Sequence, residues 1–308
     1  MNQAIAAPML ELQGACPLPH LGLIRCLGEE AAHFLHNQLT QDVLLLPHGQ
    51  SRLAAFCNAQ GRMQASMVVH KRSADEIWLI MRRDLLPRTL RRLSMFILRA
   101  KVRLSDASTD QSIWGLSGQV LHALNDQALQ PWQTLDLPQG VVIGLYPIGD
   151  QARALLLPRT EPPFGASMAH ADWLAGEILA GVADISEPTF EAFIPQMLNF
   201  ESVDGVNFKK GCYPGQEVVA RSQFRGTLKR RAFIVQAHAP MQAGQEVFAA
   251  SDASQPCGLI AQAASVHGEH VAVAELQLSA TDSVLQVGSA QGPQLTLLPL
   301  PYALREDI

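Results

Sequence analysis

The segment Lys209-Lys210-Gly211-Cys212-Tyr213-Pro214-Gly215-Gln216-Glu217 is the most informative stretch of the chain. It places one cysteine between two lysines and a Pro-Gly pair, and such a pair is typical of a tight turn. Gly211 and Gly215 allow backbone angles or close approaches that a Cβ atom would block. The mixture of apolar and polar residues that follows predicts a short helix over 216–225.

Cys212 is a candidate for thiolate chemistry. The unpaired amides at the start of the predicted helix would face it and favour an anion. Lys209 and Lys210 add positive charge beside it, and such surroundings lower the pKa of a thiol. Arg221, about one turn into the helix, is placed to assist, whereas Glu217 is expected to fix the loop by local hydrogen bonds. The alternative is a buried structural cysteine in a loop bent by glycine.

The segment over 210–217 resembles the signature Lys-Gly-Cys-Tyr-x-Gly-Gln-Glu of the YgfZ family of folate-binding proteins, which includes mitochondrial iron–sulfur assembly factors. The resemblance assigns this motif loop to the functional site, with Cys212 as the functional thiol and Lys210 and Arg221 beside it; the other loop residues are Gly211, Tyr213, Gly215, Gln216 and Glu217. Three further segments resemble the family in the same order, and all the matches lie within about 20–232: Phe34–Val43, Phe56–Met63 and Phe193–Gln196.

A strand, a helix, several strands and a second helix follow one another in the predicted elements, and this order indicates an α+β fold. The resemblance implies the three-domain, aminomethyltransferase-like architecture of the glycine-cleavage T-protein around a central folate cavity. We expect an N-terminal α+β domain over 1–110 and a second α+β domain, which carries the motif, over 111–230. Short strand candidates separated by turns predict a C-terminal β-barrel over 231–308.

Composition narrows the possible classes of protein. Of the 308 residues, 48% are hydrophobic and 17% charged, so a folded chain is expected, and the net charge of −5 argues against indiscriminate nucleic-acid binding. The five cysteines are widely spaced without a Cys-x-x-Cys pair, which suits a reducing cytosol and predicts no metal site. Neither a signal peptide nor a long apolar run is evident, so we expect a cytoplasmic protein without membrane contact.

The resemblance implies tetrahydrofolate, or a one-carbon derivative of it, as the cofactor. A folate requires an aromatic face and a few polar anchors. Trp173 is the candidate aromatic residue, because it lies off the apolar face that Ala171, Leu174 and Ile178 predict for a helix over 167–180. It also matches the family tryptophan that precedes the cysteine motif. The alternative is that Trp173 is a half-buried core residue.

Two positions depart from the aminomethyltransferase pattern. T-proteins carry an aspartate near the positions of Gln64 and Ala65, and a pterin-holding glutamate at the position of Leu179. The nearest acid, Glu177, is two residues earlier, which on a helix is a rotation of about 200°. General acid–base assistance to one-carbon transfer is therefore expected to be missing.

The resemblance therefore implies a tetrahydrofolate-binding protein that supports iron–sulfur cluster assembly or repair in client enzymes or with assembly proteins. The resemblance implies that tRNA thiolation depends on it indirectly. One alternative is a folate-dependent aminomethyl or methyl transferase. A second is an RNA-binding module that uses Arg88, Arg91 and Arg92, which share one face of a predicted helix. Without interleaved aromatic residues, that face is expected to be solvated rather than bound to tRNA.

Overall fold

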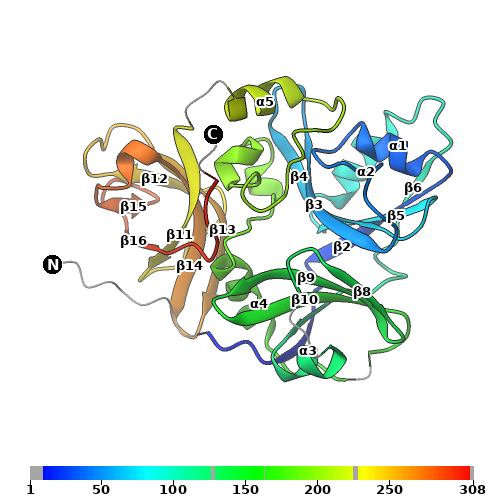
Figure 1. Ribbon diagram of the computed structural model, residues 1–308. Helices are drawn as coiled ribbons and strands as arrows, with labels where there is room; N and C mark the ends of the chain where they lie inside the picture. The colour runs from blue at the N-terminus through cyan, green and yellow to red at the C-terminus, as the bar shows by residue number, and fades with distance from the viewer. Residues whose placement is uncertain (1–9, 126–128, 163, 225–227, 306–308) are drawn as a thin grey trace.

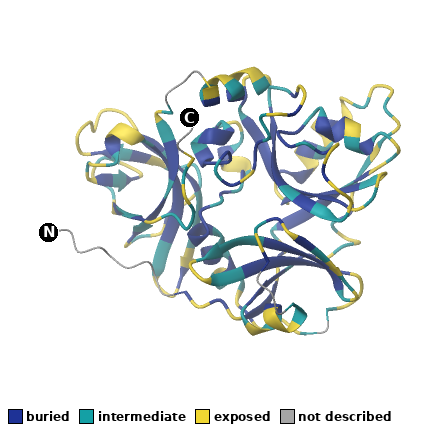
Figure 2. Ribbon diagram, in the orientation of Figure 1, coloured by how far each residue is buried: buried dark blue, intermediate teal, exposed yellow. Residues whose placement is uncertain are grey.

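The computed structural model describes residues 10–125, 129–162, 164–224 and 228–305, and the strands of this part form two open sheets and a closed barrel. In Figure 1 the first sheet lies at the right, the second at the bottom and the barrel at the left. Figure 2 shows that buried residues run along the interior of all three β structures. The predicted α+β class with a C-terminal barrel is confirmed.

The first sheet has the antiparallel strand order β3-β4-β5-β2-β6. Every residue of β4 is buried, including the polar Gln64, Ser66, His70 and Lys71, whose side chains hydrogen bond to other parts of the chain. β3 and β4 form a hairpin, and the Asn58 Oδ1 atom closes its turn by accepting the amides of Gln60 and Arg62. The strands are β2 (Leu21–Leu27), β3 (Gln50–Cys57), β4 (Met63–Lys71), β5 (Glu76–Arg82) and β6 (Arg103–Asp106).

The second sheet has the order β1-β7-β10-β9-β8. Its edge strand β1 comes from the start of the described chain, which then crosses to the first sheet before returning at β7. The domain boundaries near 110 and 230 stay a prediction. The strands are β1 (Gly14–Pro17), β7 (Trp114–Ser117), β8 (Thr134–Leu137), β9 (Gly140–Ile148) and β10 (Gln151–Pro158).

The barrel closes in the order β11-β14-β13-β12-β15-β16. Its interior holds a separate apolar cluster that includes Val235, Ile260 and Leu276. Alternation of apolar and polar residues is therefore sufficient to predict these short strands. They are β11 (Arg230–Ala237), β12 (Glu246–Ala249), β13 (Gly258–Val266), β14 (Glu269–Gln277), β15 (Leu285–Val287) and β16 (Gln294–Leu298).

The helices connect and cover these sheets. The helix predicted over 167–180 begins three residues later, at His170, because the Ser167 hydroxyl accepts the amide of Ala15 in β1 and does not cap the helix. Among the described residues, no helix is long and apolar enough to cross a membrane. The helices are α1 (Ala31–His36), α2 (Leu86–Ser94), α3 (Gln119–Leu124), α4 (His170–Leu179) and α5 (Gln216–Phe224), with 3-10 turns at Glu187–Thr189, Pro195–Leu198 and Leu278–Ala280.

Candidate functional site

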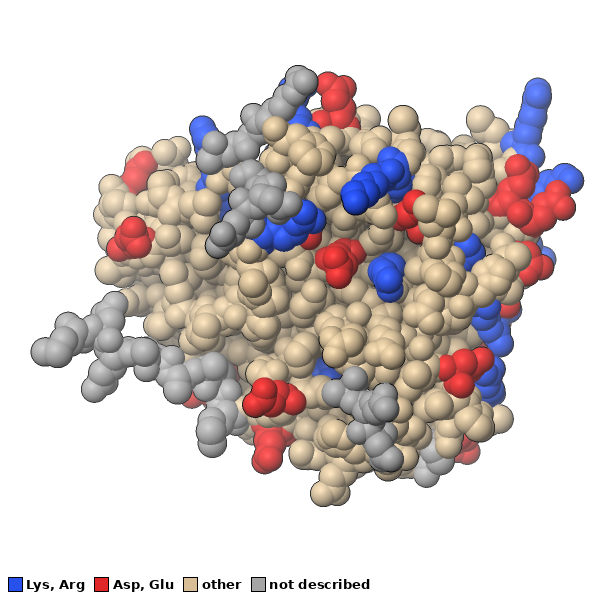
Figure 3. All heavy atoms as spheres, viewed as in Figure 1, with Lys and Arg blue, Asp and Glu red and all other residues tan. Residues whose placement is uncertain are grey.

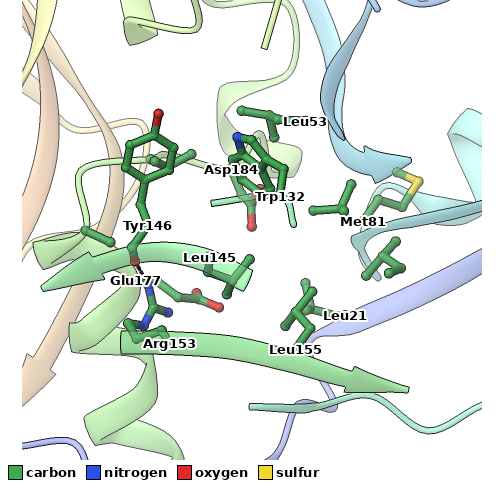
Figure 4. A pocket seen from close by; sticks show the side chains of 14 residues that line it. Leu21, Leu53, Met81, Trp132, Leu145, Tyr146, Arg153, Leu155, Glu177 and Asp184 are labelled. Atoms are coloured by element: carbon green, nitrogen blue, oxygen red, sulfur yellow. Dashed lines mark hydrogen bonds between the residues drawn. The ribbon is translucent and has the colours of Figure 1, made fainter. Parts of the chain in front are cut away.

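A cavity with about 600 Å³ of empty space, part of it open to solvent, lies between the two open sheets and the end of α4 (Figure 4). The first sheet contributes apolar side chains, among them Leu53 and Met81, and the second sheet contributes Leu145, Tyr146 and Leu155. These positions come from β3, β5, β9 and β10, so strand pairing and sheet packing bring them together. Its walls are mostly apolar with a few polar groups, which is typical of small-molecule sites.

Two aromatic side chains give the cavity a flat surface. Trp132 and Tyr146 both line it, with ring centres 5.8 Å apart. The indole nitrogen of Trp132 donates to the carbonyl of Val203 at 3.0 Å, which fixes the ring against the segment after α4. Planar rings held in this way can pack against a flat ligand.

Glu177 supplies a carboxylate at the cavity (Figure 4). Its Oε1 atom accepts from His20 Nε2 at 3.1 Å and from Trp173 Nε1 at 2.8 Å, and its Oε2 atom accepts from Gln262 Nε2 at 3.2 Å. Burial acts to raise the pKa of Glu177, but the hydrogen bond and charge of His20, with further contributions from Arg153 and Trp173, lower it overall. Glu177 is therefore held ionised.

Asp184, just beyond α4, supplies a second carboxylate, hydrogen bonded to the Ser66 hydroxyl at 3.0 Å. Burial raises the pKa of Asp184 to about 6, and the negative charge of Glu177 adds to this shift. Gln262, on barrel strand β13, accepts the Asp184 amide at 2.9 Å while it donates to Glu177. One barrel side chain therefore fixes both acidic positions.

Arg153 brings unused hydrogen-bond donors to the same cavity. Its Nη1 atom makes a long contact of 3.5 Å with the carbonyl of Tyr146, while Nε and Nη2 are buried without a partner among the described residues. Burial lowers the pKa of Arg153 to about 10, so the guanidinium stays charged near neutrality. Orphaned buried donors are costly, and a ligand with acceptor atoms would satisfy them.

The motif loop lies elsewhere, against α1 and the β3–β4 turn, and none of its residues lines the cavity. Cys212 is exposed, so it is not the buried structural cysteine of the alternative interpretation. Gly215 has φ +79°, and a Cβ atom there would lie 2.4 Å from the carbonyl oxygen of Asn58 and 2.6 Å from Gly61. Gly211 has only one ordinary contact, at 3.4 Å from His36.

Lys210 is buried and acts as a cap for α1. Its ammonium donates to the carbonyls of His36 and Leu39, the latter at 2.8 Å, and lies 4.8 Å from the centre of the Tyr213 ring. Burial lowers the pKa of Lys210 to about 8, and the nearby charges of Asp42 and of a Cys212 thiolate act in the opposite direction. Lys210 therefore joins loop and helix, with its charge close to the thiol.

The helix predicted over 216–225 is present as α5, and Arg225 lies outside the described residues. Gln216 begins it and also contacts the Lys210 carbonyl, at 3.4 Å. Arg221 donates to Glu217 at 2.9 Å on an exposed face, so Glu217 pairs along its own helix and does not fix the loop. The role predicted for Glu217 is therefore wrong. Glu217 and Arg221 are four residues apart, the spacing at which side chains on a helix meet.

Trp173 lies in the core, with its ring 0% exposed. A Cβ atom on Gly115 would lie 2.5 Å from the ring, which shows how directly the indole packs on β7. The predicted apolar face of α4 is wrong: Ala171 is exposed and Leu174 half-buried. Because α4 packs on both the second sheet and barrel strands β13 and β14, its buried face follows those contacts and includes Trp173, Ala175, Gly176, Ile178 and Leu179.

The structure thus keeps the predicted thiol region and the cavity apart. Lys210, Cys212 and Tyr213 share one loop, whereas Trp173 does not line the cavity and supports it through its hydrogen bond to Glu177 and its ring contact with the Arg153 guanidinium, 4.4 Å from the ring centre. The rotation argument against Glu177 is also wrong, because this residue lines the cavity. The sequence analysis did not predict Trp132, Tyr146, Arg153 or Asp184 as site residues. The sequence feature that could have indicated them is a charged or aromatic residue within an otherwise apolar strand or just after the end of a helix.

The arginines predicted to share a face of α2 are exposed. Arg88 pairs with Glu187 at 2.7 Å, and its guanidinium lies 3.6 Å from the centre of the Phe190 ring. On the face shown in Figure 3, acidic and basic side chains are interspersed and do not form one continuous basic area.

A cavity with aromatic and apolar walls, two partly buried carboxylates and orphaned guanidinium donors fits a planar heterocycle that carries both N–H donors and acceptor atoms. The pterin ring of a folate has this pattern, with an amide and amine edge beside ring nitrogens and a carbonyl oxygen. Glu177 and Asp184 could accept from its N–H groups, and Arg153 could donate to its acceptors.

Comparisons with known proteins agree with this architecture. The chain is 30% identical over 329 residues to the tRNA-modifying protein YgfZ of Yersinia enterocolitica, which covers 99% of both chains. It is 33% identical to the protein of the same name from Edwardsiella ictaluri, covering 91% of this chain and 89% of the relative. The fold is similar to that of the glycine cleavage system aminomethyltransferase T from Bartonella henselae, with a TM-score of 0.63 and 14% identity, covering 94% of this chain and 86% of that structure. No family model matches the chain.

Proposed function

The chain belongs to the YgfZ family, and on that basis we propose that it binds tetrahydrofolate or a one-carbon derivative and supports iron–sulfur cluster assembly or repair in client enzymes. Its relatives carry the name of tRNA-modifying proteins, and we propose that this chain supports tRNA modification through such clients. We assign this function to the cytoplasm, where the spacing of its cysteines suits a reducing environment.

The observation that carries the folate proposal is the cavity of Figure 4, where orphaned Arg153 donors and the carboxylates of Glu177 and Asp184 face one space beside Trp132. A bound tetrahydrofolate supplies a carrier for one-carbon units. The residues of this chain bind and orient the ring: the carboxylates select N–H donors, the guanidinium selects acceptors, and the aromatic walls exclude water. Trp173 acts through Glu177, whose Oε1 atom it fixes by its indole hydrogen bond.

The proposal is tested by titration with 5-formyltetrahydrofolate, a stable reduced folate, followed by tryptophan fluorescence. We expect binding to wild type and a loss of at least tenfold in affinity for Arg153→Gln and Glu177→Gln, because each removes a charged partner. Arg159→Gln and Glu187→Gln are matched controls, since both residues form exposed ion pairs outside the cavity. Equal affinity in all four variants, or none in wild type, would remove the cavity from folate binding.

The iron–sulfur part of the proposal rests on Cys212. This thiol is exposed, lies close to the charge of Lys210 and precedes the first residue of α5 by four positions, while the other cysteines are buried. We test it by complementation of a strain that lacks the endogenous protein, reading the activity of an iron–sulfur enzyme. Cys212→Ala is expected to lose complementation, and Ser222→Ala, an exposed position on α5, to retain it. Full activity of Cys212→Ala would reject the assigned thiol.

One observation favours a second candidate function, a folate-dependent one-carbon transferase. Glu177 and Asp184 bring acids to the cavity from positions other than those that T-proteins use, and an acid that titrates at about pH 6 can exchange protons near neutrality. The absence of acids at Gln64, Ala65 and Leu179 therefore does not by itself exclude turnover.

A further inference from the structure

Two histidines connect the carboxylate of Glu177 to the surface of the protein. His20, in the turn before β2, contacts Glu177 Oε1 through Nε2 at 3.1 Å. Its other ring nitrogen, Nδ1, lies 2.8 Å from Nε2 of His170, the first residue of α4. His170 is partly exposed, whereas Glu177 lines the cavity. A continuous chain of hydrogen bonds therefore runs from solvent to the ligand cavity.

The chemistry of the two rings restricts where protons can lie. With Glu177 ionised, His20 must donate from Nε2. If His20 is neutral, its Nδ1 atom is an acceptor and His170 donates from Nε2. If His20 is an imidazolium, its Nδ1 atom donates, and His170 must be neutral with its proton on Nδ1. The two states differ by one proton and by the tautomer of His170.

We propose that His170, His20 and Glu177 form a proton relay between solvent and the cavity, in which His20 is the positioning residue that holds the Glu177 carboxylate. A proton from solvent binds His170 Nδ1, and the proton on His170 Nε2 passes to His20 Nδ1. The proton on His20 Nε2 can then pass to Glu177 Oε1. One proton enters, one carboxylate is neutralised, and both rings end neutral.

The charged groups around the relay favour this order. Burial and the neighbouring charge of His20 lower the pKa of His170, so His170 stays neutral when His20 carries the proton. The carboxylates stabilise the imidazolium of His20, whereas the guanidinium groups oppose it. The groups that face the relay are Arg82 at the end of β5, Arg153 on β10, Asp184 after α4, Asp172 on α4 with its partner His267, and the Cys16 thiol on β1.

The relay gives the cavity a way to adjust its charge to a ligand without opening. A ligand that donates N–H groups to Glu177 keeps the ionised carboxylate, whereas a ligand that presents an acceptor atom requires the protonated carboxyl, and its proton can enter through His170 and His20. That the ligand is a folate rests on the proposed function. The relay itself is present in the protein without ligand.

The direct test is an NMR titration of the unliganded protein with ¹⁵N-labelled histidine, which reports the proton on each ring nitrogen. We expect protonation of His20 to be accompanied by a switch of the His170 proton from Nε2 to Nδ1. In Glu177→Gln and in His170→Gln, each of which changes one hydrogen-bond partner of His20, the pattern of protons on the His20 ring nitrogens should differ from wild type. His122, exposed on α3, is the internal reference. Uncoupled changes at the two histidines, or the wild-type pattern at His20 in both variants, would overturn the relay.

A second test measures protons exchanged on binding, by calorimetry with 5-formyltetrahydrofolate in buffers of different ionisation enthalpy. Wild type and His122→Gln should exchange the same number of protons, and His20→Gln, which can still donate to Glu177 but cannot titrate, should exchange less than half as many. Undiminished exchange in His20→Gln would count against the relay. If wild type binds no folate, the proposed function fails while the NMR titration still decides the relay.

Discussion

Exposure separates Cys212 from the other cysteines of the chain. Burial raises the pKa of Cys16 to about 11 and that of Cys26 and Cys57 to about 12, and it also raises the pKa of Cys257. We therefore expect iodoacetamide at neutral pH to alkylate Cys212 before the others, as mass spectrometry of the digested protein can show. Earlier labelling of a buried thiol would mean that the loop protects Cys212.

Asp184 illustrates how an acid that lines the cavity can reduce stability. In the folded protein its pKa is raised from 3.8 to about 6, so between these values the folded state binds more protons than the unfolded state. Stability contributed by this proton is present below the unfolded pKa and is lost as pH rises through about 6. Asp184→Asn stays neutral and should raise the free energy of unfolding by roughly 1–3 kcal/mol above that pH.

Urea denaturation at acidic and mildly alkaline pH measures this effect. The gain should be much smaller at acidic pH, where Asp184 itself is protonated, and folate affinity should fall at both values. Asp150→Asn, at an exposed position, is the control and should change neither quantity. A gain of the same size at both pH values would show that the carboxylate charge is not its cause.

At the scale of elements, the motif loop is held by two interlocking turns. Gly215 and Gly61 both have positive φ, and their backbones meet where the loop packs on the β3–β4 turn. Gly215→Ala would combine backbone strain with a clash against the Asn58 carbonyl. We expect it to destabilise the protein by about 1–3 kcal/mol and to reduce complementation.

Thermal unfolding tests this prediction, with Gly211→Ala as the matched control. Gly211 lies in the same loop, its φ is not in the positive region, and an added Cβ atom there would make only an ordinary contact. The control should unfold near the wild-type temperature. Equal losses in the two variants would indicate that any added methyl group disturbs the loop.

The helices and strands also differ in how well the sequence predicts them. Strands such as β4 and β13 follow from local apolar patterns, and the β3–β4 turn follows from Asn58 and Gly61, because these signals lie within a few residues of each other. The buried face of α4 could not be predicted from its period, since two different partners pack on the helix. The cavity was harder still: Leu53, Trp132 and Asp184 become neighbours only through sheet pairing and chain crossover.

At the scale of the whole molecule, the architecture of an aminomethyltransferase is present while the T-protein acids are not. We expect no measurable formation of methylene-tetrahydrofolate from an aminomethyl donor, because loss of well-placed acid–base assistance typically costs about 10²–10⁴ in rate. The assay compares wild type with a control without protein. Turnover above that control, abolished in Asp184→Asn or Glu177→Gln, would favour the transferase and assign these acids its chemistry.

Gln262 restricts which substitutions this chain can accept during evolution. A residue of the barrel donates to Glu177 and accepts from the backbone of Asp184, although the cavity walls belong to the two sheets. A substitution of Glu177 leaves the Gln262 donor without its acceptor, and a substitution of Gln262 leaves the Oε2 atom of Glu177 and the backbone amide of Asp184 each without that partner, so tolerated changes at positions 177 and 262 should arrive together. Aligned relatives should therefore show covariation between positions 177 and 262, linking segments of the chain that lie 85 residues apart.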